Sequence, residues 1–179
     1  VEIDTSLENL DYIPVFIKKP FRKSKAYQEA GITRNSYLRY HIEHYLEENN
    51  ILKNRVIRFL NNLSKMFSEE GRLEERKIVL KCKGWFLESM KNLTEIRRSH
   101  VHEIRFDDDD LSRLHIFELT STYSEDEDLE LAATLSYELV KKEWSERIIN
   151  NNKTLREVID AVFGSLLPIV FPSEGQVAR

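Results

Sequence analysis

The chain has 179 residues, of which 41 % are hydrophobic and 32 % are charged, and its formal net charge is −4. This composition is typical of one globular domain with a charged surface. It argues against a general nucleic-acid coat protein, which would carry a high net positive charge. With only five glycines and four prolines, the chain has few turn residues for a sheet protein of this size, so the sequence predicts an all-α fold.

Compartment and membrane association can also be predicted from composition. No apolar run approaches the ~18 residues of a membrane span, and the first residues lack the basic and apolar regions of a signal peptide. We therefore expect no membrane partner. The single cysteine, Cys82, excludes an internal disulfide and fits a reducing, cytoplasmic location.

Residues 1–35 are predicted to form an N-terminal arm. Their apolar stretch at 11–17 has weak helical periodicity, and Pro14 and Pro20 limit it to an extended segment at an edge of the domain. The helical pattern begins near Ser36 and reaches Gly71, a typical C-terminal cap, although Asn49 and Asn50 either weaken or break it. A further helix is predicted from Leu73 to Val101 or Ile104.

The remaining residues are predicted to form a loop and two more helices. Residues 106–124 are a loop with a short helical or extended piece at 111–119. A helix starts at Ser124 and ends before a turn at 150–152. Thr154 and Glu157 have capping-box spacing and open a last helix, which ends near Pro168. We expect an up-and-down bundle of four to five long helices over residues 36–168, with a loose tail at 169–179, in a single domain.

Two arginines and two histidines lie within six residues, 97–102, at the end of the predicted central helix. RNA cleavage by a 2′-hydroxyl needs a group that titrates near neutral pH, and His102 can accept and return that proton. It also needs a fixed positive charge on the phosphate, which Arg97 can supply through two parallel hydrogen bonds.

Arg97 and His102, separated by four residues on a core helix of an all-helical domain, resemble the signature of the HEPN superfamily of helical-bundle proteins. Val101, a small apolar residue before the histidine, also fits the family pattern, whereas Arg98 stands where the family more often has Asn, Asp or His. The resemblance implies a metal-independent endoribonuclease without a cofactor, acting at a homodimer cleft. It also implies a toxin or antiviral defence protein, with an antitoxin or another protein as a partner.

The spacing of the motif leaves its geometry open. Residues five positions apart on a helix point ~140° apart, so Arg97 and His102 do not share one face of a straight helix. Either the helix ends before His102, or Arg97 reaches around it, or a second subunit completes the site. Arg98 shares a face with His102 and competes for the phosphate contact, and His100 is a supporting residue.

Three further side chains are predicted RNA contacts: Tyr40, His44 and Lys23. Tyrosine can stack on an unpaired base, which would make this face of the helix the second wall of an RNA cleft. Packing of the tyrosine and histidine face on a neighbour is the simpler alternative.

Two alternatives to the ribonuclease remain. A helical HEPN-like module without catalysis could bind a nucleotide or a partner protein. The second alternative is a metal site, because His41 and His44 lie on one side of a helix and could join His100 and His102. No Asp or Glu stands at a clear ligand spacing, so the sequence predicts no metal.

Overall fold

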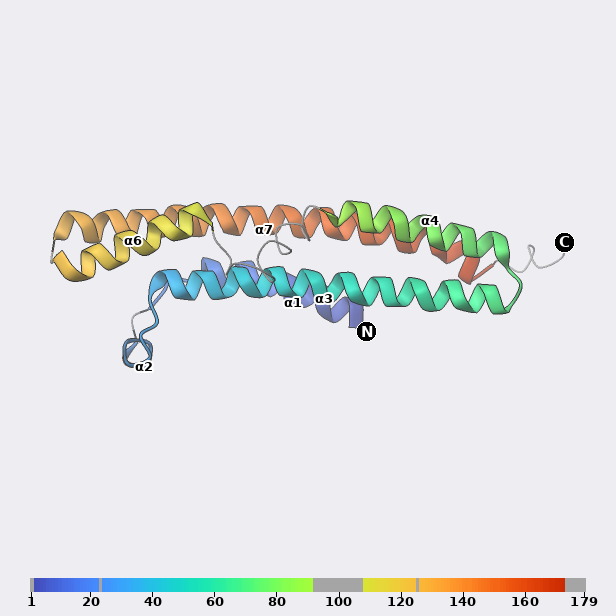
Figure 1. Ribbon diagram of the computed structural model, residues 1–179, viewed down its shortest axis with the longest axis horizontal. Helices are drawn as coiled ribbons and strands as arrows, with labels where there is room; N and C mark the ends of the chain where they lie inside the picture. Colours follow the sequence, from blue (N-terminus) through green and yellow to red (C-terminus); the bar gives the residue numbers. More distant parts are fainter. Residues whose placement is uncertain (1, 23, 92–107, 125, 173–179) are drawn as a thin grey trace.

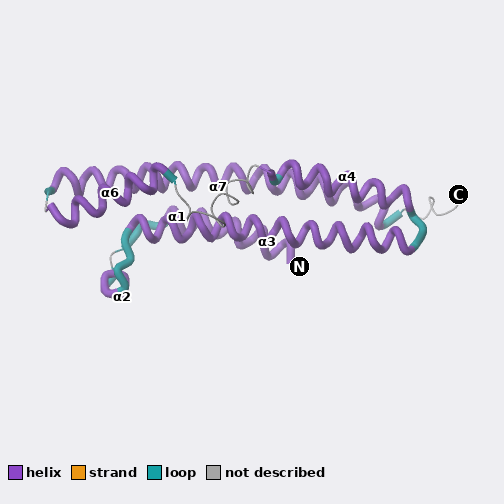
Figure 2. Tube along the Cα trace, viewed as in Figure 1, coloured by secondary structure: helices purple, strands orange, loops and turns teal. Residues whose placement is uncertain are grey.

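The computed structural model describes residues 2–22, 24–91, 108–124 and 126–172, and all of their regular structure is helical (Figures 1 and 2). Their helices are α1 (Glu2–Lys18), α2 (Lys25–Glu29), α3 (Arg34–Glu69), α4 (Leu73–Ser89), α6 (Asp109–Ser124) and α7 (Glu127–Val170). The all-α class predicted from the sequence is confirmed. No helix in these ranges is long and apolar enough to cross a membrane.

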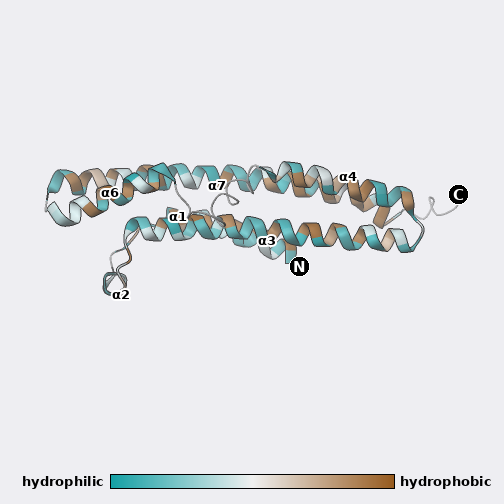
Figure 3. Cartoon of the chain, viewed as in Figure 1, coloured by the Kyte–Doolittle hydropathy of each residue, from teal (hydrophilic) through white to brown (hydrophobic). Residues whose placement is uncertain are grey.

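The two longest helices, α3 and α7, run in the same direction along the length of the molecule (Figure 1). α1 runs in the opposite direction and contacts both of them. α4 and α6 also run opposite to α7 and pack on its two ends, one after the other. The described helices therefore form an elongated bundle. Figure 3 shows hydrophobic residues interspersed with hydrophilic ones along them, as expected for helices that bury one face.

α3 is one continuous helix of 36 residues. Its start is fixed by Thr33, whose side chain accepts a hydrogen bond from the Ser36 N–H while Ser36 bonds back to the Thr33 N–H. Asn49 does not break the helix, because its amide donates to the Tyr45 carbonyl at 2.8 Å within the same helix. Gly71 follows the helix with φ +74°, a conformation that favours glycine, and the predicted C-terminal cap is confirmed.

The predicted extended arm is wrong, because residues 2–18 form helix α1. Leu10, Ile13 and Ile17 are fully buried at helical spacing. Pro14 has no N–H to bond the Leu10 carbonyl four residues earlier, a loss that usually disfavours a helix interior. Here the buried Asn152 side chain on α7 donates to the Leu10 oxygen at 2.8 Å. A residue from a distant helix thus compensates for the proline.

The predicted turn at 150–152 and the helix start at Thr154 are also wrong. α7 continues through both as a helix of 44 residues and through Pro168, so residues 169 and 170 of the predicted loose tail are helical. Residues 173–179 of that tail lie outside the described residues. Asn152 is buried against α1, and the Thr154 hydroxyl donates to the Asn150 carbonyl inside the helix. Asn152 thus joins α7 to α1, and Thr154 bonds within α7, so neither residue marks a turn or a helix start.

The predicted loop at 106–124 is a helix over most of its length. Asp108 caps the start of α6, since its carboxylate accepts hydrogen bonds from the N–H groups of Asp110 and Leu111, both at 3.1 Å. α6 ends at Ser124, and Asp126 caps α7, so the helix start predicted at Ser124 is displaced by two to three residues. α4 ends at Ser89, and the remainder of the helix predicted to reach Val101 or Ile104 lies outside the described residues.

Candidate functional site

Five of the predicted site residues lie outside the described residues: Lys23, Arg97, Arg98, His100 and His102. The structure therefore neither brings them together nor separates them. It does describe both helices that flank residues 92–107. α4 ends near the buried Met90 and α6 starts near the buried Leu111, and both ends lie toward the middle of the molecule's length (Figure 1).

Side-chain contacts show which residues of α3 lie beside the end of α4 and the start of α6. Lys83 on α4 donates to Asn61 Oδ1 on α3 at 2.8 Å, and Arg34 Nε on α3 lies 3.2 Å from Glu118 Oε1 on α6. Both pairs of helices are antiparallel, so α4 ends alongside roughly residue 55 of α3 and α6 begins alongside roughly residue 43. His44 thus lies at the level where α6 begins.

The two predicted RNA contacts that the structure describes, Tyr40 and His44, belong to a row of rings. The Tyr40 and His44 rings are stacked with centroids 6.3 Å apart and an interplanar angle of 13°. His41 packs edge-on against Tyr37 at 4.5 Å and stacks on Phe16 of α1 at 5.8 Å. We call Phe16, Tyr37, Tyr40, His41 and His44 the ring row. Tyr40 is 64 % exposed, so the row offers a ring face to solvent.

A hollow of about 560 Å³ opens beside the ring row. Its lining comes from the end of α1, from α2 and from the start of α3: Phe16, Tyr27, Ile32, Ser36, Tyr37, Tyr40 and His41. Phe16 and Tyr27 were not among the predicted site residues, because nothing in the sequence shows that a helix before residue 19 lies against α3. The sequence feature that could have indicated Phe16 and Tyr27 is the repeated occurrence of aromatic residues near basic ones over residues 16–44.

Its surroundings favour the neutral form of His41. Burial lowers its pKa from the ordinary value of 6.5, and repulsion from His44 lowers it further. A neutral imidazole stacked on Phe16 can take part in ring stacking and hydrogen bonding without bringing a positive charge into the hollow.

Replacing His44 by glutamine is expected to raise the pKa of His41, because the charge that repels the protonated form is removed. The measurement is an NMR titration of the His41 ring protons. The pKa of His41 is lower in the folded protein than in the unfolded chain. As the pH falls below about 6.5, the unfolded chain therefore binds a proton at His41 more readily, and the free energy of unfolding decreases. His41→Gln should reduce that decline. A His41 pKa that stays the same or falls in His44→Gln would contradict this account.

A network of hydrogen bonds and ion pairs fixes the start of α3, just before the ring row in the sequence. Arg34 Nη1 donates to Thr134 Oγ1 at 2.7 Å, and Nη2 lies 2.8 Å from Glu130 Oε1. Glu118 accepts from Arg34 Nε and, at 3.1 Å, from the N–H of Asn35. The Arg34 and Glu118 side chains are only 13 % and 10 % exposed. One arginine therefore joins α3 to both α6 and α7.

The described residues contain no group of three or more His, Cys, Asp or Glu side chains that could hold a metal ion. His41 and His44 are on one side of α3, as predicted, but His41 is engaged by Phe16 and Tyr37. The other two histidines of the predicted metal alternative, His100 and His102, lie outside the described residues. The observed geometry therefore gives the metal alternative no support.

Comparison of the chain with models of protein families, with curated proteins and with solved structures finds no match in any of the three.

Proposed function

We propose that the protein is a metal-independent endoribonuclease of the HEPN type. His102 is the general base and acid, Arg97 contacts the phosphate, and Arg98 and His100 support them. The supporting observation is the ring row: it displays an exposed tyrosine and stacked imidazoles, and it ends at the level where α6 begins. The motif, at residues 97–102, precedes α6 in the sequence, and the proposal is that RNA bound on the ring row reaches it.

The proposed chemistry uses groups that this chain supplies. His102 removes the proton from the ribose 2′-hydroxyl, the 2′-oxygen attacks the adjacent phosphorus, and the bond to the 5′-oxygen breaks. Arg97 offsets the negative charge that develops on the phosphate oxygens. The protonated histidine then returns a proton to the leaving 5′-oxygen. The products are a 2′,3′-cyclic phosphate and a 5′-hydroxyl, and no metal or other cofactor takes part.

The test is cleavage of a single-stranded RNA in the presence of excess chelator. We expect cleavage to continue and to leave 2′,3′-cyclic phosphate ends, because the nucleophile is the substrate's own hydroxyl. A matched RNA with 2′-deoxyribose at the cleaved position should remain intact. Loss of activity with chelator, followed by recovery with a divalent metal, would contradict the proposal.

A homodimer is part of the proposal, and α7 offers a surface for it. Leu131, Leu135 and Leu139 are 57 %, 62 % and 58 % exposed at spacings of four, on the face opposite the buried Ala133, Tyr137 and Val140. The neighbouring helix α6 also exposes three large hydrophobic residues: Ile116, Leu119 and Tyr123.

Leu135→Glu is expected to convert the dimer to a monomer, because it places a charge in the centre of an apolar interface. Sedimentation velocity over a range of concentrations measures this. The matched control is Leu167→Glu, since Leu167 is 57 % exposed near the other end of the same helix. A wild-type protein that is monomeric at all concentrations would contradict the dimer, and so would dissociation of both variants alike.

A second candidate is a non-catalytic HEPN-like module that binds a nucleotide or partner protein, since the ring row could bind a base without any cleavage. Binding of RNA without cutting would favour it. A role as a toxin or antiviral defence protein and an antitoxin partner belong to the ribonuclease proposal and rest on the sequence resemblance alone. A cytoplasmic location is also proposed, and it rests on the single cysteine.

A further inference from the structure

The segment that joins α1 to α3 is strongly basic. Residues 18–30 contain five basic side chains and one acidic one, whereas the whole chain has a net charge of −4. Four of the basic residues are described and exposed: Lys18, Lys19, Arg22 and Lys25. Within the described residues, Lys19 and Arg22 form no ion pair, whereas Lys25 lies 3.7 Å from Glu29. Local positive charge on an acidic protein attracts a polyanion to that place.

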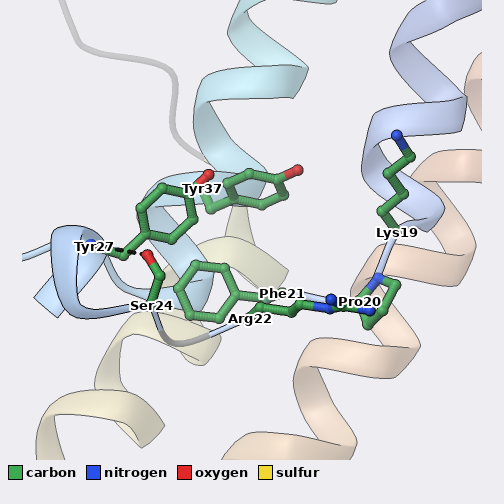
Figure 4. Close-up of a pocket in the computed structure, with 7 residues that line it drawn as sticks. All are labelled: Lys19, Pro20, Phe21, Arg22, Ser24, Tyr27 and Tyr37. Atoms are coloured by element: carbon green, nitrogen blue, oxygen red, sulfur yellow. Dashed lines mark hydrogen bonds between the residues drawn. The ribbon is translucent and has the colours of Figure 1, made fainter.

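Three aromatic rings gather on this basic segment. Phe21 lies 5.7 Å from Tyr27 and 5.6 Å from Tyr37, and the two tyrosine rings are 6.3 Å apart. These rings line a hollow of about 500 Å³ together with Lys19, Pro20, Arg22 and Ser24. Figure 4 shows the three rings grouped on one side and the Lys19 amine on the other side. We call this the ring–cation hollow.

The ring–cation hollow adjoins the hollow beside the ring row, because Tyr27 and Tyr37 line both. Lys19 lines the ring–cation hollow, and its amine lies 5.4 Å from the centroid of the Phe16 ring, which lines the other hollow. Aromatic faces thus extend from the basic segment to Tyr40, with cationic groups at one end.

We propose that the ring–cation hollow binds an unpaired nucleotide segment of single-stranded RNA, with bases on Tyr27 and Phe21 and phosphates near Lys19 and Arg22. This rests on the proposed function for the identity of the ligand as RNA. Stacking on aromatic side chains needs bases that are free of a duplex stack, and cations beside the rings follow the phosphate backbone. The hollow therefore makes the protein select single-stranded over double-stranded RNA.

The rings also hold the segment against α3, so the test must separate binding from packing. Tyr27→Leu keeps an apolar side chain but removes the aromatic face. Lys19→Glu with Arg22→Glu reverses two charges without altering the rings. The matched control is Lys65→Glu with Lys77→Glu, an equal change of charge at exposed positions near the other end of the molecule.

The experiment measures fluorescence anisotropy of a labelled single-stranded oligouridylate, with a self-complementary RNA duplex as competitor. All variants are made in the full chain carrying His102→Ala, so that the probe is not cut. Lys19→Glu with Arg22→Glu should weaken binding about tenfold or more and reduce its salt dependence. Tyr27→Leu should weaken it roughly tenfold, as for the loss of one stacked base, and the control pair less than about twofold.

Three results would overturn the inference: equal effects of the two charge-reversed pairs, duplex competing as well as single strand, or a proline-rich peptide binding at these rings in place of RNA. Cleavage assays separate this inference from the proposed function. If the parent chain with His102 intact binds RNA at this hollow without cutting it, the ribonuclease proposal fails and the inference stands. If Lys19→Glu with Arg22→Glu, made with His102 intact, cuts RNA with unchanged KM, the inference fails and the ribonuclease stands.

Discussion

Replacing Arg34 by methionine is expected to lower the free energy of unfolding by about 3 kcal/mol, because the largely buried Glu118 carboxylate loses its positive partner. Arg34 bonds to Glu118, Glu130 and Thr134, and its side chain is only 13 % exposed. Without it, the Glu118 carboxylate keeps one hydrogen bond from the described residues, that from the N–H of Asn35, and remains an uncompensated charge between α3 and α6. Urea unfolding followed by circular dichroism gives the value.

Two comparisons make the Arg34 result specific. Lys25→Met also removes a cation from an ion pair, but Lys25 and Glu29 are 89 % and 68 % exposed, so the loss should be within ~0.5 kcal/mol. Arg34→Met combined with Glu118→Leu should regain part of the lost stability, because the stranded charge is gone. Stability of Arg34→Met within about 1 kcal/mol of the parent protein would show that the network does not hold α3 to α6 and α7.

His102→Ala is expected to reduce single-turnover RNA cleavage by at least roughly a thousandfold, within the range for loss of a general acid and base. Arg97→Ala should reduce it by roughly a hundredfold or more, because a fixed charge on the developing phosphate anion is lost. Both variants should keep the helical content of the parent, measured by circular dichroism, and both should still bind single-stranded RNA.

His115→Ala is the matched control for the loss of an imidazole. His115 is an exposed histidine on α6, the helix that follows the motif stretch, and no role is proposed for it. Its variant should cleave RNA at the parent rate. Equal loss of activity in His115→Ala and His102→Ala would mean that the effect of His102 is not specific to the proposed chemistry.

The helical class and the long helix α3 could be predicted from the sequence because local patterns determine them. Leu38, Ile42 and Tyr45 repeat at helical spacing, and Gly71 supplies the left-handed residue that ends the run. These signals depend only on neighbours along the chain.

α1 and the middle of α7 could not be predicted because tertiary contacts override the local signals. Pro14 argues against a helix until Asn152 is seen to bond the Leu10 carbonyl, 142 residues away in sequence. The same contact explains why the three asparagines at 150–152 form no turn. The sequence pattern alone cannot show that Asn152 supplies the hydrogen bond that Pro14 lacks.

The candidate site was predictable only in part for the same reason. Tyr40 and His44 could be assigned to one face of a helix from their spacing alone. Phe16 joins that face only because α1 packs against α3, and Tyr27 joins it because its ring lies 6.3 Å from the Tyr37 ring. Arg97 and His102 are motif residues outside the described ranges, so their roles remain predictions from the sequence.

The most direct test of the ribonuclease is single-turnover cleavage of a single-stranded RNA, in chelator, by the parent protein and by the double variant Arg97→Ala with His102→Ala. The parent protein is expected to cut and to leave 2′,3′-cyclic phosphate ends. The double variant should fold, bind the RNA and leave it intact. Cleavage that survives in the double variant would contradict the assignment of Arg97 and His102 as the catalytic pair.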